Sequence, residues 1–460
     1  MDKTTEQLEK GKILPLIFKL TIPAVISQLI TFLYNIIDRI YVSHIQERPM
    51  DALAALGIVL PITLILNAFS NLIGLGGSPK ASFRLGQGDE KEANAIFNTS
   101  VILLFLIGIL LSVVTFFFAE DIILLFGCPK SAVLYATEYL KIYSLGSLFV
   151  MFSQGLNPFI TALGHSFTRM MSVLIGALLN IGFDPLFIFV FKMGVKGAAL
   201  ATILSQFFSF VWILFFFLSK KSLFSFQKVD FFNKRIFSIL SLGISPFIMT
   251  LTECAIQIVF NINLNSSTGG DSNYTAALTI LLSALQLISL PLNGLGYGMQ
   301  PFVSYNYGKG NGERLKKGIQ YVTIIAFLFA CAVYSISMFF PILYAKLFSA
   351  TAEVEKIVTD NAPLFLMGSI MFFIQMTLQN INVALGQALS ALLLAVLRKV
   401  VIMIPLCFLL TYLLGYKGVF LSEGITDALA GVITGITFLF TFPKIFKSCE
   451  KNKNKATLKI

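Results

Sequence analysis

The chain has 460 residues, of which 56% are hydrophobic and only 12% are charged, and its mean hydropathy is +0.83. A soluble domain carries about a quarter charged residues, so the composition excludes a soluble globular protein. The net charge of +11 does not indicate a nucleic-acid partner, because the basic residues lie in short patches between apolar runs, as in the cytoplasmic loops of membrane proteins. With about 20 apolar residues for each membrane-spanning helix, the length accommodates roughly twelve such helices and no soluble domain beside them.

The apolar stretches predict where these helices lie. The first stretch follows a polar segment and has no small-residue cleavage site after it, so we expect a retained membrane helix rather than a signal peptide. Most of the runs are uncharged, whereas three are interrupted by acidic residues and one follows a basic pair. In chain order, the predicted spans are 20–37, 52–79, 93–119, 142–168, 170–191, 197–219, 236–270, 272–308, 318–345, 361–397, 400–416 and 418–443.

The basic residues predict the orientation of these spans. With the N-terminus in the cytoplasm, 23 of the Lys and Arg residues assigned to loops and tails fall inside and seven fall outside. An excess of this kind is the positive-inside pattern. We therefore expect both termini in the cytoplasm.

Two segments of the chain repeat each other. Residues 71–88 (NLIGLGGSPKASFRLGQG) and 293–310 (NGLGYGMQPFVSYNYGKG) are identical at seven of eighteen positions after a shift of 222 residues. The constant order and spacing disfavour the alternative, which is chance recurrence of Gly and Pro in membrane helices. The identical pairs are Asn71/Asn293, Gly74/Gly296, Gly76/Gly298, Pro79/Pro301, Ser82/Ser304, Gly86/Gly308 and Gly88/Gly310, and similar shifts align 162–164 with 384–386, 194–197 with 415–418, and Pro23 with Pro246.

The repeat unit contains six predicted spans, and an even number returns the chain to the same side of the membrane. The two halves therefore share one orientation, which is the parallel class of transporter repeat and suits alternating access. A membrane enzyme has no physical need for this arrangement. We predict an all-α integral membrane fold with an N-terminal lobe at 1–219, a cytoplasmic linker at 220–235, a C-terminal lobe at 236–446 and a basic cytoplasmic tail at 447–460.

The sequence carries no motif typical of catalysis or of cofactor binding. The five Cys residues form no Cys-x-x-Cys pair, and His44 and His165 are 121 positions apart, so neither a disulfide framework nor a zinc site is indicated. The glycine string at 74–82 lacks the spacing of a phosphate-binding loop. We expect no enzyme activity, no cofactor and no nucleic-acid partner.

Polar residues within the N-terminal spans give the clearest functional signal, because a charge at mid-bilayer costs about 2.5–3.5 kcal/mol on insertion scales. Asp184 lies in the fifth span, with Asn180 one helical turn before it. Asp38 ends the first apolar run, where the alternative is an interfacial position beside Arg39, and Thr202 offers a hydroxyl in the sixth span. Such oxygens suit a sodium ion, and two close carboxylates suit a proton. The predicted cation-coupling site is Asp38, Asn180, Asp184 and Thr202, which would also be the metal ligands if the ion is Na+.

Three further acids lie within the C-terminal spans. Glu253 follows Pro246 by seven residues in an apolar helix, and Glu423 and Asp427 are four apart on one helix face. These are candidate coupling groups. The alternative is that Arg398 pairs with Glu423 and Asp427 and makes them structural.

Three prolines fall inside predicted spans. Proline removes a backbone hydrogen bond, and membrane helices tolerate this where neighbours satisfy the freed carbonyl. The predicted bending points are Pro23, Pro185 and Pro246. A static kink is the plain alternative for each.

At these residues the sequence resembles the multidrug and toxic compound extrusion (MATE) family, in its DinF-like branch. The resemblance covers essentially the whole chain. Its most specific strings are ASFRLGQGDEKEA at 81–93 and VSYNYGKGNGERLKKG at 303–318, with support from YNIID at 34–38, LLNIGFDPLFIF at 178–189 and GVKGAALAT at 194–202.

The resemblance implies two six-helix lobes around a V-shaped cleft and an exchange of organic cations or other amphipathic drugs for Na+ or protons. The predicted cation-coupling site matches the N-terminal-lobe cation site of that branch, so ion binding there is expected to shift the first and fifth helices and weaken drug contacts. The chain departs from the pattern at Thr161, where many relatives have Arg. It also carries Glu423 where the repeat partner is Thr202, which favours a further ion-linked group.

We therefore expect a monomeric secondary active exporter of the bacterial cytoplasmic membrane, with small amphipathic or cationic substrates and membrane lipids as its partners. One rival function is a flippase for lipid-linked or polyisoprenoid substrates, which needs a cationic cleft to hold phosphates. Basic residues at depth are mainly Arg398 and Lys399. The second rival is a membrane-embedded enzyme. The sequence does not choose between Na+ and protons, and it names neither the substrate nor the stoichiometry.

Overall fold

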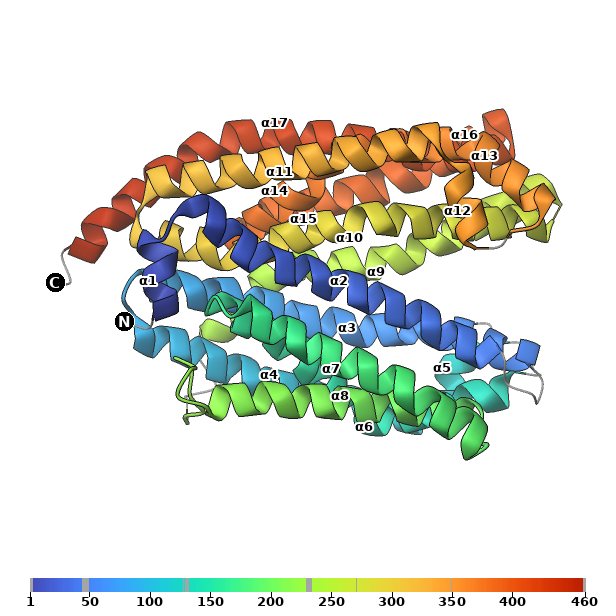
Figure 1. Ribbon diagram of the computed structural model, residues 1–460, viewed down its shortest axis with the longest axis horizontal. Coiled ribbons are helices and arrows are strands. Elements are labelled where there is room, and N and C mark those ends of the chain that lie inside the picture. Colours follow the sequence, from blue (N-terminus) through green and yellow to red (C-terminus); the bar gives the residue numbers. More distant parts are fainter. Residues whose placement is uncertain are drawn as a thin grey trace. The chain divides into compact units, whose positions relative to one another are not determined.

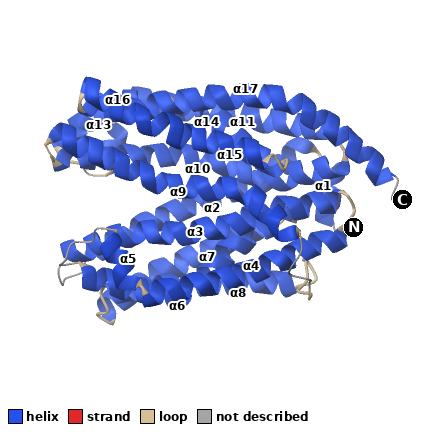
Figure 2. Ribbon diagram, turned by 180° about the vertical axis from the view of Figure 1, so that it is seen from behind, coloured by secondary structure: helices blue, strands red, loops and turns tan. Residues whose placement is uncertain are grey.

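The computed structural model describes residues 3–43, 49–126, 128, 132–228, 234–269, 271–348 and 350–457. All regular secondary structure in these ranges is helical, as Figure 1 and Figure 2 show. The all-α fold predicted from the apolar runs is confirmed. Its physical basis is that a helix satisfies each backbone polar group within its own segment, which a lipid environment requires.

The described chain forms twelve long helical segments and three short helices. The short ones are α1 (Lys3–Lys10), α5 (Ala119–Leu125) and α12 (Ile342–Leu347). In the first half the long segments are α2 (Ile13–Ser43), α3 (Pro49–Gly86), α4 (Glu90–Phe117), α6 (Val133–Ala162), α7 (Ser166–Pro185) with the π-helical turn η1 (Leu186–Val190), and α8 (Val195–Leu218). In the second half they are α9 (Arg235–Thr268), α10 (Ser272–Lys309), α11 (Gly312–Phe339), α13 (Ala352–Leu366) with η2 (Ser369–Met371) and α14 (Phe372–Ala384), α15 (Ala388–Val396) with the π-helical η3 (Leu397–Met403) and α16 (Ile404–Leu414), and α17 (Tyr416–Thr457).

Nine of these segments are long and apolar enough to cross a membrane, judged on the described residues, and the bent pair α13 and α14 is a tenth if it forms one span. The other two long segments, α3 and α6, are not among these candidates, so the twelve long segments include nine or ten that are apolar enough to span. Several predicted spans run past the ends of their helices, and glycines at helix ends account for two of these cases. The run 361–397 covers parts of two segments, because α14 ends before Gly386, whose φ is +77°. Similarly, α6 ends at Ala162 before Gly164, whose φ is +79°, instead of continuing to 168.

The chain divides into two compact units. Unit 1 contains Met1–Lys10 and Ile26–Thr250, and unit 2 contains Gly11–Val25 and Leu251–Ile460. These units differ from the predicted lobes in two segments. The first part of α2 belongs to unit 2, and the first part of α9 belongs to unit 1. Each unit is therefore built from one half of the sequence together with half a helix from the other.

Unit 1 is organised around α6, which packs against α3, α4 and α8. Small residues allow this close packing: a Cβ atom on Gly146 would lie 2.0 Å from a side-chain carbon of Ile203, and one on Gly155 would lie 2.5 Å from Leu104. The buried core of this unit includes Val59, Ile62, Tyr139, Leu140 and Val195. Without a hydrophobic difference between helix and lipid, such close contacts supply much of the packing energy.

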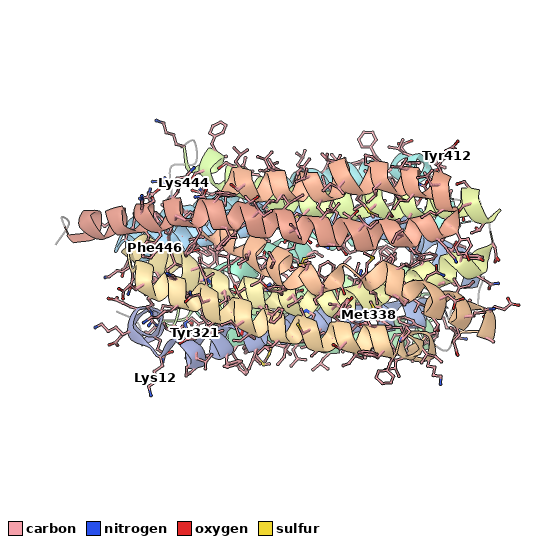
Figure 3. All side chains as sticks on the ribbon, turned by 90° about the horizontal axis from the view of Figure 1, so that it is seen from above. Lys12, Tyr321, Met338, Tyr412, Lys444 and Phe446 are labelled. Atoms are coloured by element: carbon pink, nitrogen blue, oxygen red, sulfur yellow. The ribbon has the colours of Figure 1, made fainter. Side chains whose placement is uncertain are left out.

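Unit 2 is organised around α10 and α17. α10 packs against α11, α13 and α14, and α17 packs against α13, α14 and α16. Figure 3 shows Lys12 and Lys444 toward one end of this unit and Tyr412 toward the other. The long exposed apolar side chains along its helices, such as Leu328 and Leu439, suit contact with lipid.

The internal repeat is visible in the backbone. Three glycine pairs that the sequence alignment matches adopt positive φ in both halves, and each pair has nearly the same value. Gly88 and Gly310 have φ of +75° and +79°, Gly164 and Gly386 have +79° and +77°, and Gly194 and Gly415 have +56° and +62°. Because non-glycine residues rarely adopt this region, the repeated glycines occupy repeated helix boundaries.

The glycines at 76 and 298 explain why each unit accepts half a helix from the other half of the sequence. A Cβ atom on Gly76 would lie 2.3 Å from the carbonyl oxygen of Ile239 in α9. A Cβ atom on Gly298 would lie 2.6 Å from Cα of Thr21 in α2. In both units, therefore, the repeated glycine permits backbone contact with the incoming half-helix.

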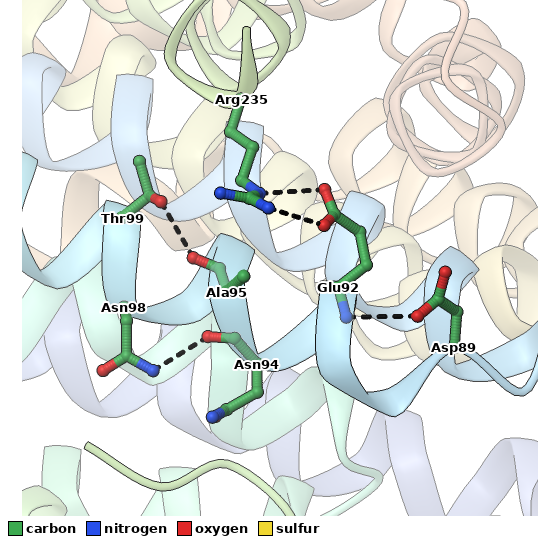
Figure 4. A network of polar contacts seen from close by, with 7 residues as sticks. All are labelled: Asp89, Glu92, Asn94, Ala95, Asn98, Thr99 and Arg235. Carbon is green, nitrogen blue, oxygen red and sulfur yellow. Dashed lines mark hydrogen bonds and ion pairs between the residues drawn. The ribbon is translucent and has the colours of Figure 1, made fainter. Parts of the chain in front are cut away.

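The predicted linker 220–235 is fastened to α4 in its described part. Asn98 donates a hydrogen bond to the carbonyl of Ser225 at 2.9 Å and accepts one from the backbone N–H of Gln227 at 3.0 Å. Arg235 donates two hydrogen bonds to the Glu92 carboxylate, at 3.0 and 2.9 Å, as Figure 4 shows. The linker thus belongs to unit 1 by specific polar contacts as well as by sequence position.

Candidate functional site

The N-terminal candidate site lies at the end of α7. Asp184 is fully buried, and Asn180 donates a hydrogen bond from Nδ2 to its Oδ1 at 3.4 Å. The spacing of four residues places both side chains on one helix face. Pro185 ends α7, and the next turn widens into the π-helical η1. Proline lacks the backbone N–H that would continue the α-helical ladder, and π-helical turns occur frequently at functional sites.

Of the other two predicted coupling residues, the structure describes the side chain of one, Thr202. Thr202 lies on α8, which packs against α7, but its hydroxyl donates to the carbonyl of Ala198 in its own helix at 3.0 Å. The side chain of Asp38 lies outside the described part of the structure. Among the described side chains, no three His, Cys, Asp or Glu residues gather as metal ligands would. The oxygen Oδ1 of Asn180 is buried and has no hydrogen-bond partner among the described residues, so this oxygen is available to a ligand.

A chain of largely buried polar groups that links α6, α7 and α8 was missed by reasoning from acidic residues. Ser153 of α6 donates to the amide oxygen of Gln206 on α8 at 2.7 Å. Ser209, also on α8, donates to the carbonyl of Ser172 on α7 at 2.9 Å, and the Ser172 hydroxyl donates to Asn157 at 2.9 Å. The available signal was the recurrence of Ser within otherwise apolar spans, since buried hydroxyls need partners.

Thr161 marks the departure from the family pattern that the sequence shows. Arg169 lies eight residues further on and donates a hydrogen bond from Nη1 to the Thr161 hydroxyl at 3.4 Å. A guanidinium therefore lies beside this position although the residue itself is Thr. The charge is supplied from α7 instead of from the end of α6.

In the C-terminal half, Arg398 is the common partner of Glu423 and Asp427. Its Nη2 lies 2.5 Å from Oδ1 of Asp427 and 3.6 Å from Oε1 of Glu423. The amide oxygen of Gln375, in the orientation that satisfies both groups, accepts from Nε and Nη1 at 3.2 and 3.1 Å. The Phe372 ring lies 5.4 Å from the guanidinium carbon. The structure thus brings the two acids to Arg398, as the alternative from the sequence describes.

The third acid, Glu253, pairs with Lys399 instead. The Lys399 Nζ lies 3.0 Å from Glu253 Oε1, and the side chains are 9% and 53% exposed, respectively. Lys399 follows Arg398 directly in η3, and both side chains are buried in this π-helical turn. The predicted bending points Pro23 and Pro246 lie inside α2 and α9, close to the places where each helix passes from one unit to the other.

Comparisons with known proteins agree with this architecture. The family model MatE matches residues 23–186 and again residues 246–409. Multidrug export protein MepA of Staphylococcus haemolyticus is 28% identical over 72% of both chains, and MepA of Staphylococcus aureus is 26% identical over 73% of this chain and 74% of its own. A solved structure described as the outward-facing conformation of a multidrug resistance MATE family transporter of the MOP superfamily has a TM-score of 0.89, at 24% identity, over 98% of this chain and 100% of that one.

The fold, together with the match of one family model to each half of the chain, defines the class of protein. It is a multi-pass membrane transporter built from two repeats and not an enzyme. The chain belongs to the MATE family. The resemblance to the MATE family that the sequence strings carry is thereby confirmed at the level of the family. The two matched ranges begin at Pro23 and Pro246, which are the two prolines that the internal repeat aligns, at a shift within one residue of 222.

Proposed function

We propose that this transporter exports amphipathic or cationic compounds across the bacterial cytoplasmic membrane in exchange for an inward-moving Na+ or proton. The observation that carries this proposal is the fully buried Asp184, held by Asn180 at a π-helical turn within a membrane segment. A carboxylate there is costly unless it binds a cation during the cycle. The names of the MepA relatives support drug-like substrates.

In this proposal the ion binds at Asn180 and Asp184, with Asp38 and Thr202 as further oxygen donors. Na+ or a proton neutralises the buried carboxylate, and ion and drug disfavour each other by a coupling free energy that is typically about 1–3 kcal/mol. The protein acts as a monomer with both termini in the cytoplasm and contacts membrane lipids along its exposed apolar faces. No cofactor takes part.

The flippase alternative gains no support from the described residues. A flippase needs positively charged side chains within the membrane that are free to bind the phosphates of its substrate. Arg398 and Lys399 both form ion pairs with carboxylates of the chain. The two buried cations Arg398 and Lys399 are therefore already paired with acids of the chain. An export function for cationic or amphipathic compounds is the better fit.

Ethidium efflux tests the proposal. The purified chain is reconstituted into vesicles, and Na+ and proton gradients are imposed separately on the wild type, Asp184→Asn and the control Asp121→Asn, whose acid is exposed on α5. We expect one gradient to drive efflux in the wild type and the control, and Asp184→Asn to abolish that dependence. Efflux that ignores both gradients and the Asp184 change would overturn the N-terminal coupling site, and an absence of cation movement would overturn drug export.

A further inference from the structure

The segment that follows α8, residues 219–228 (SKKSLFSFQK), carries three lysines and no acid. In this basic strap all three lysines are exposed. Two large apolar side chains between them, Leu223 and Phe226, are 36% and 41% exposed. Cations interspersed with exposed apolar groups are typical of segments that lie on the surface of an anionic membrane.

The backbone of the basic strap is held against α4. Asn94 accepts a hydrogen bond from the Ser225 N–H at 2.9 Å. Asn98 donates to the Ser225 carbonyl at 2.9 Å and accepts from the Gln227 N–H at 3.0 Å. The two asparagines are one helical turn apart, so both amides face the strap. These contacts fix the path of the strap before any partner binds, which lowers the entropic cost of binding.

Two phenylalanines of the strap are buried to different extents. Phe224 is 1% exposed and stacks on Phe97 of α4, with 5.2 Å between the ring centroids. Phe226 contacts the same ring at 5.6 Å and Phe217 at 6.4 Å, yet 41% of its surface is exposed. Phe224 therefore anchors the strap, while Phe226 still offers apolar surface to a partner.

The lipid-facing side of α8 leads directly into the strap. Phe208, Trp212 and Phe215 recur at helical spacing and are 42%, 39% and 67% exposed, which indicates an apolar stripe along this membrane segment. Leu218 ends α8 and is 65% exposed, and Lys220 follows two residues later. Figure 1 shows this end of α8 at the same end of unit 1 as α1. The lysines therefore follow the apolar span directly, where lipid headgroups lie.

We propose that the basic strap binds the headgroups of anionic phospholipids in the cytoplasmic leaflet. Its lysines pair with the headgroup phosphates, and Leu223 and Phe226 enter the boundary between headgroups and acyl chains. The charge of the strap is complementary to this partner, and its apolar groups continue the lipid-facing stripe of α8. The choice of leaflet follows from the proposed orientation of the termini, whereas the binding chemistry is independent of the export function.

The chain contains its own reporter for this lipid. Trp212 is the single tryptophan and lies in the apolar stripe of α8. The full-length chain is reconstituted in mixtures of phosphatidylcholine and phosphatidylglycerol, with bromine on the acyl chains of one lipid at a time. Quenching of the Trp212 fluorescence by each brominated lipid then measures their relative binding. We expect phosphatidylglycerol to be preferred roughly threefold, and the preference to fall as the salt concentration rises.

Neutralising part of the strap separates it from the general positive charge of the cytoplasmic loops. Lys220→Gln with Lys221→Gln should remove most of the preference for phosphatidylglycerol. The matched control is Lys316→Gln with Lys317→Gln, another adjacent pair of exposed lysines, in α11. This control should keep the wild-type preference. Retention of a single gel-filtration peak shows that each variant is folded.

Three outcomes overturn the assignment. The first is equal quenching by the two lipids in the wild type. The second is an equal loss of preference in both lysine pairs, which shows only a general positive field. The third is competition by inorganic phosphate at constant ionic strength, which identifies a soluble anion as the occupant. None of these measurements uses a substrate or a gradient, so each leaves the proposed export function standing.

Discussion

Arg398 and Asp427 form a buried ion pair between η3 and α17, with Nη2 and Oδ1 2.5 Å apart and the side chains 5% and 0% exposed. The two residues are 29 positions apart in the sequence. The pair explains how a membrane segment retains an arginine and an aspartate that would each be costly alone.

Loss of the arginine is expected to destabilise the protein strongly. Arg398→Met leaves Asp427 and Glu423 buried without their shared cation, and removing one partner of a buried pair typically costs about 3–5 kcal/mol. Thermal unfolding in detergent should show a clearly lower Tm. Adding Asp427→Leu to Arg398→Met should recover part of the loss, because the surplus carboxylate is then gone. If Arg398→Met unfolds at the wild-type temperature, the pair is not structural.

Replacing either of the repeated glycines Gly76 and Gly298 by alanine should destabilise the protein. Gly76→Ala places a methyl group 2.3 Å from the carbonyl oxygen of Ile239, and forcing extra carbon into a packed contact typically costs about 1–3 kcal/mol. Gly298→Ala meets Thr21 in the same way. The control is Gly182→Ala in α7, where a Cβ atom meets nothing within 4 Å, so its stability should be unchanged or slightly higher. Equal Tm values for all three variants would contradict the close approach of the half-helices.

The hydrogen bonds between Asn98 and the linker should protect the linker from proteolysis. Asn98→Ala removes two hydrogen bonds to the linker backbone, so trypsin should cut faster at Lys220, Lys221 or Lys228. Thr99→Ala on the same helix is the control, because among the described residues that hydroxyl bonds to the carbonyl of Ala95 in its own helix (Figure 4). Cleavage rates are compared by gel electrophoresis of the folded protein. Identical rates for the two variants would show that the Asn98 contacts do not hold the linker.

Replacing Asn180 is expected to change the ion dependence of efflux more than the thermal stability of the fold. Asn180→Ala removes both the hydrogen bond to Asp184 and the free amide oxygen. The free amide oxygen is a proposed Na+ ligand, and a polar contact to a charged group is worth about 1.5–3 kcal/mol, so the Na+ concentration for half-maximal efflux should rise at least tenfold. If the ion is a proton, the required proton concentration should instead fall, because the carboxylate loses a hydrogen bond that stabilises its charged form. The Tm should change little, because the cavity left by a truncated Asn is small. An unchanged ion dependence would remove Asn180 from the coupling site.

The sequence was informative wherever a local pattern had one structural solution. Long apolar runs predicted helices, and the recurrence of Gly88 and Gly310 predicted an internal repeat, which the backbone shows as nearly equal positive φ at both glycines. Prediction was poorer where two spans run together without a charge, as in 361–397. There a single glycine in the left-handed region separates α14 from α15, and glycine alone does not reveal whether it ends a helix or packs within it.

By itself, the sequence determined the membrane class, the long helical segments and the internal repeat, because these depend on composition and on patterns along the chain. The resemblance of specific strings, such as ASFRLGQGDEKEA at 81–93, indicated the family. Only the tertiary structure decided which charges meet. The sequence predicts Glu253, Glu423 and Asp427 together as candidate coupling groups. In the structure, Glu253 pairs with Lys399, whereas Glu423 and Asp427 both pair with Arg398. It also decided that the first parts of α2 and α9 belong to the opposite units. Ion pairing and helix exchange depend on distances between segments far apart in the sequence, and hydropathy along the chain carries no information about such distances.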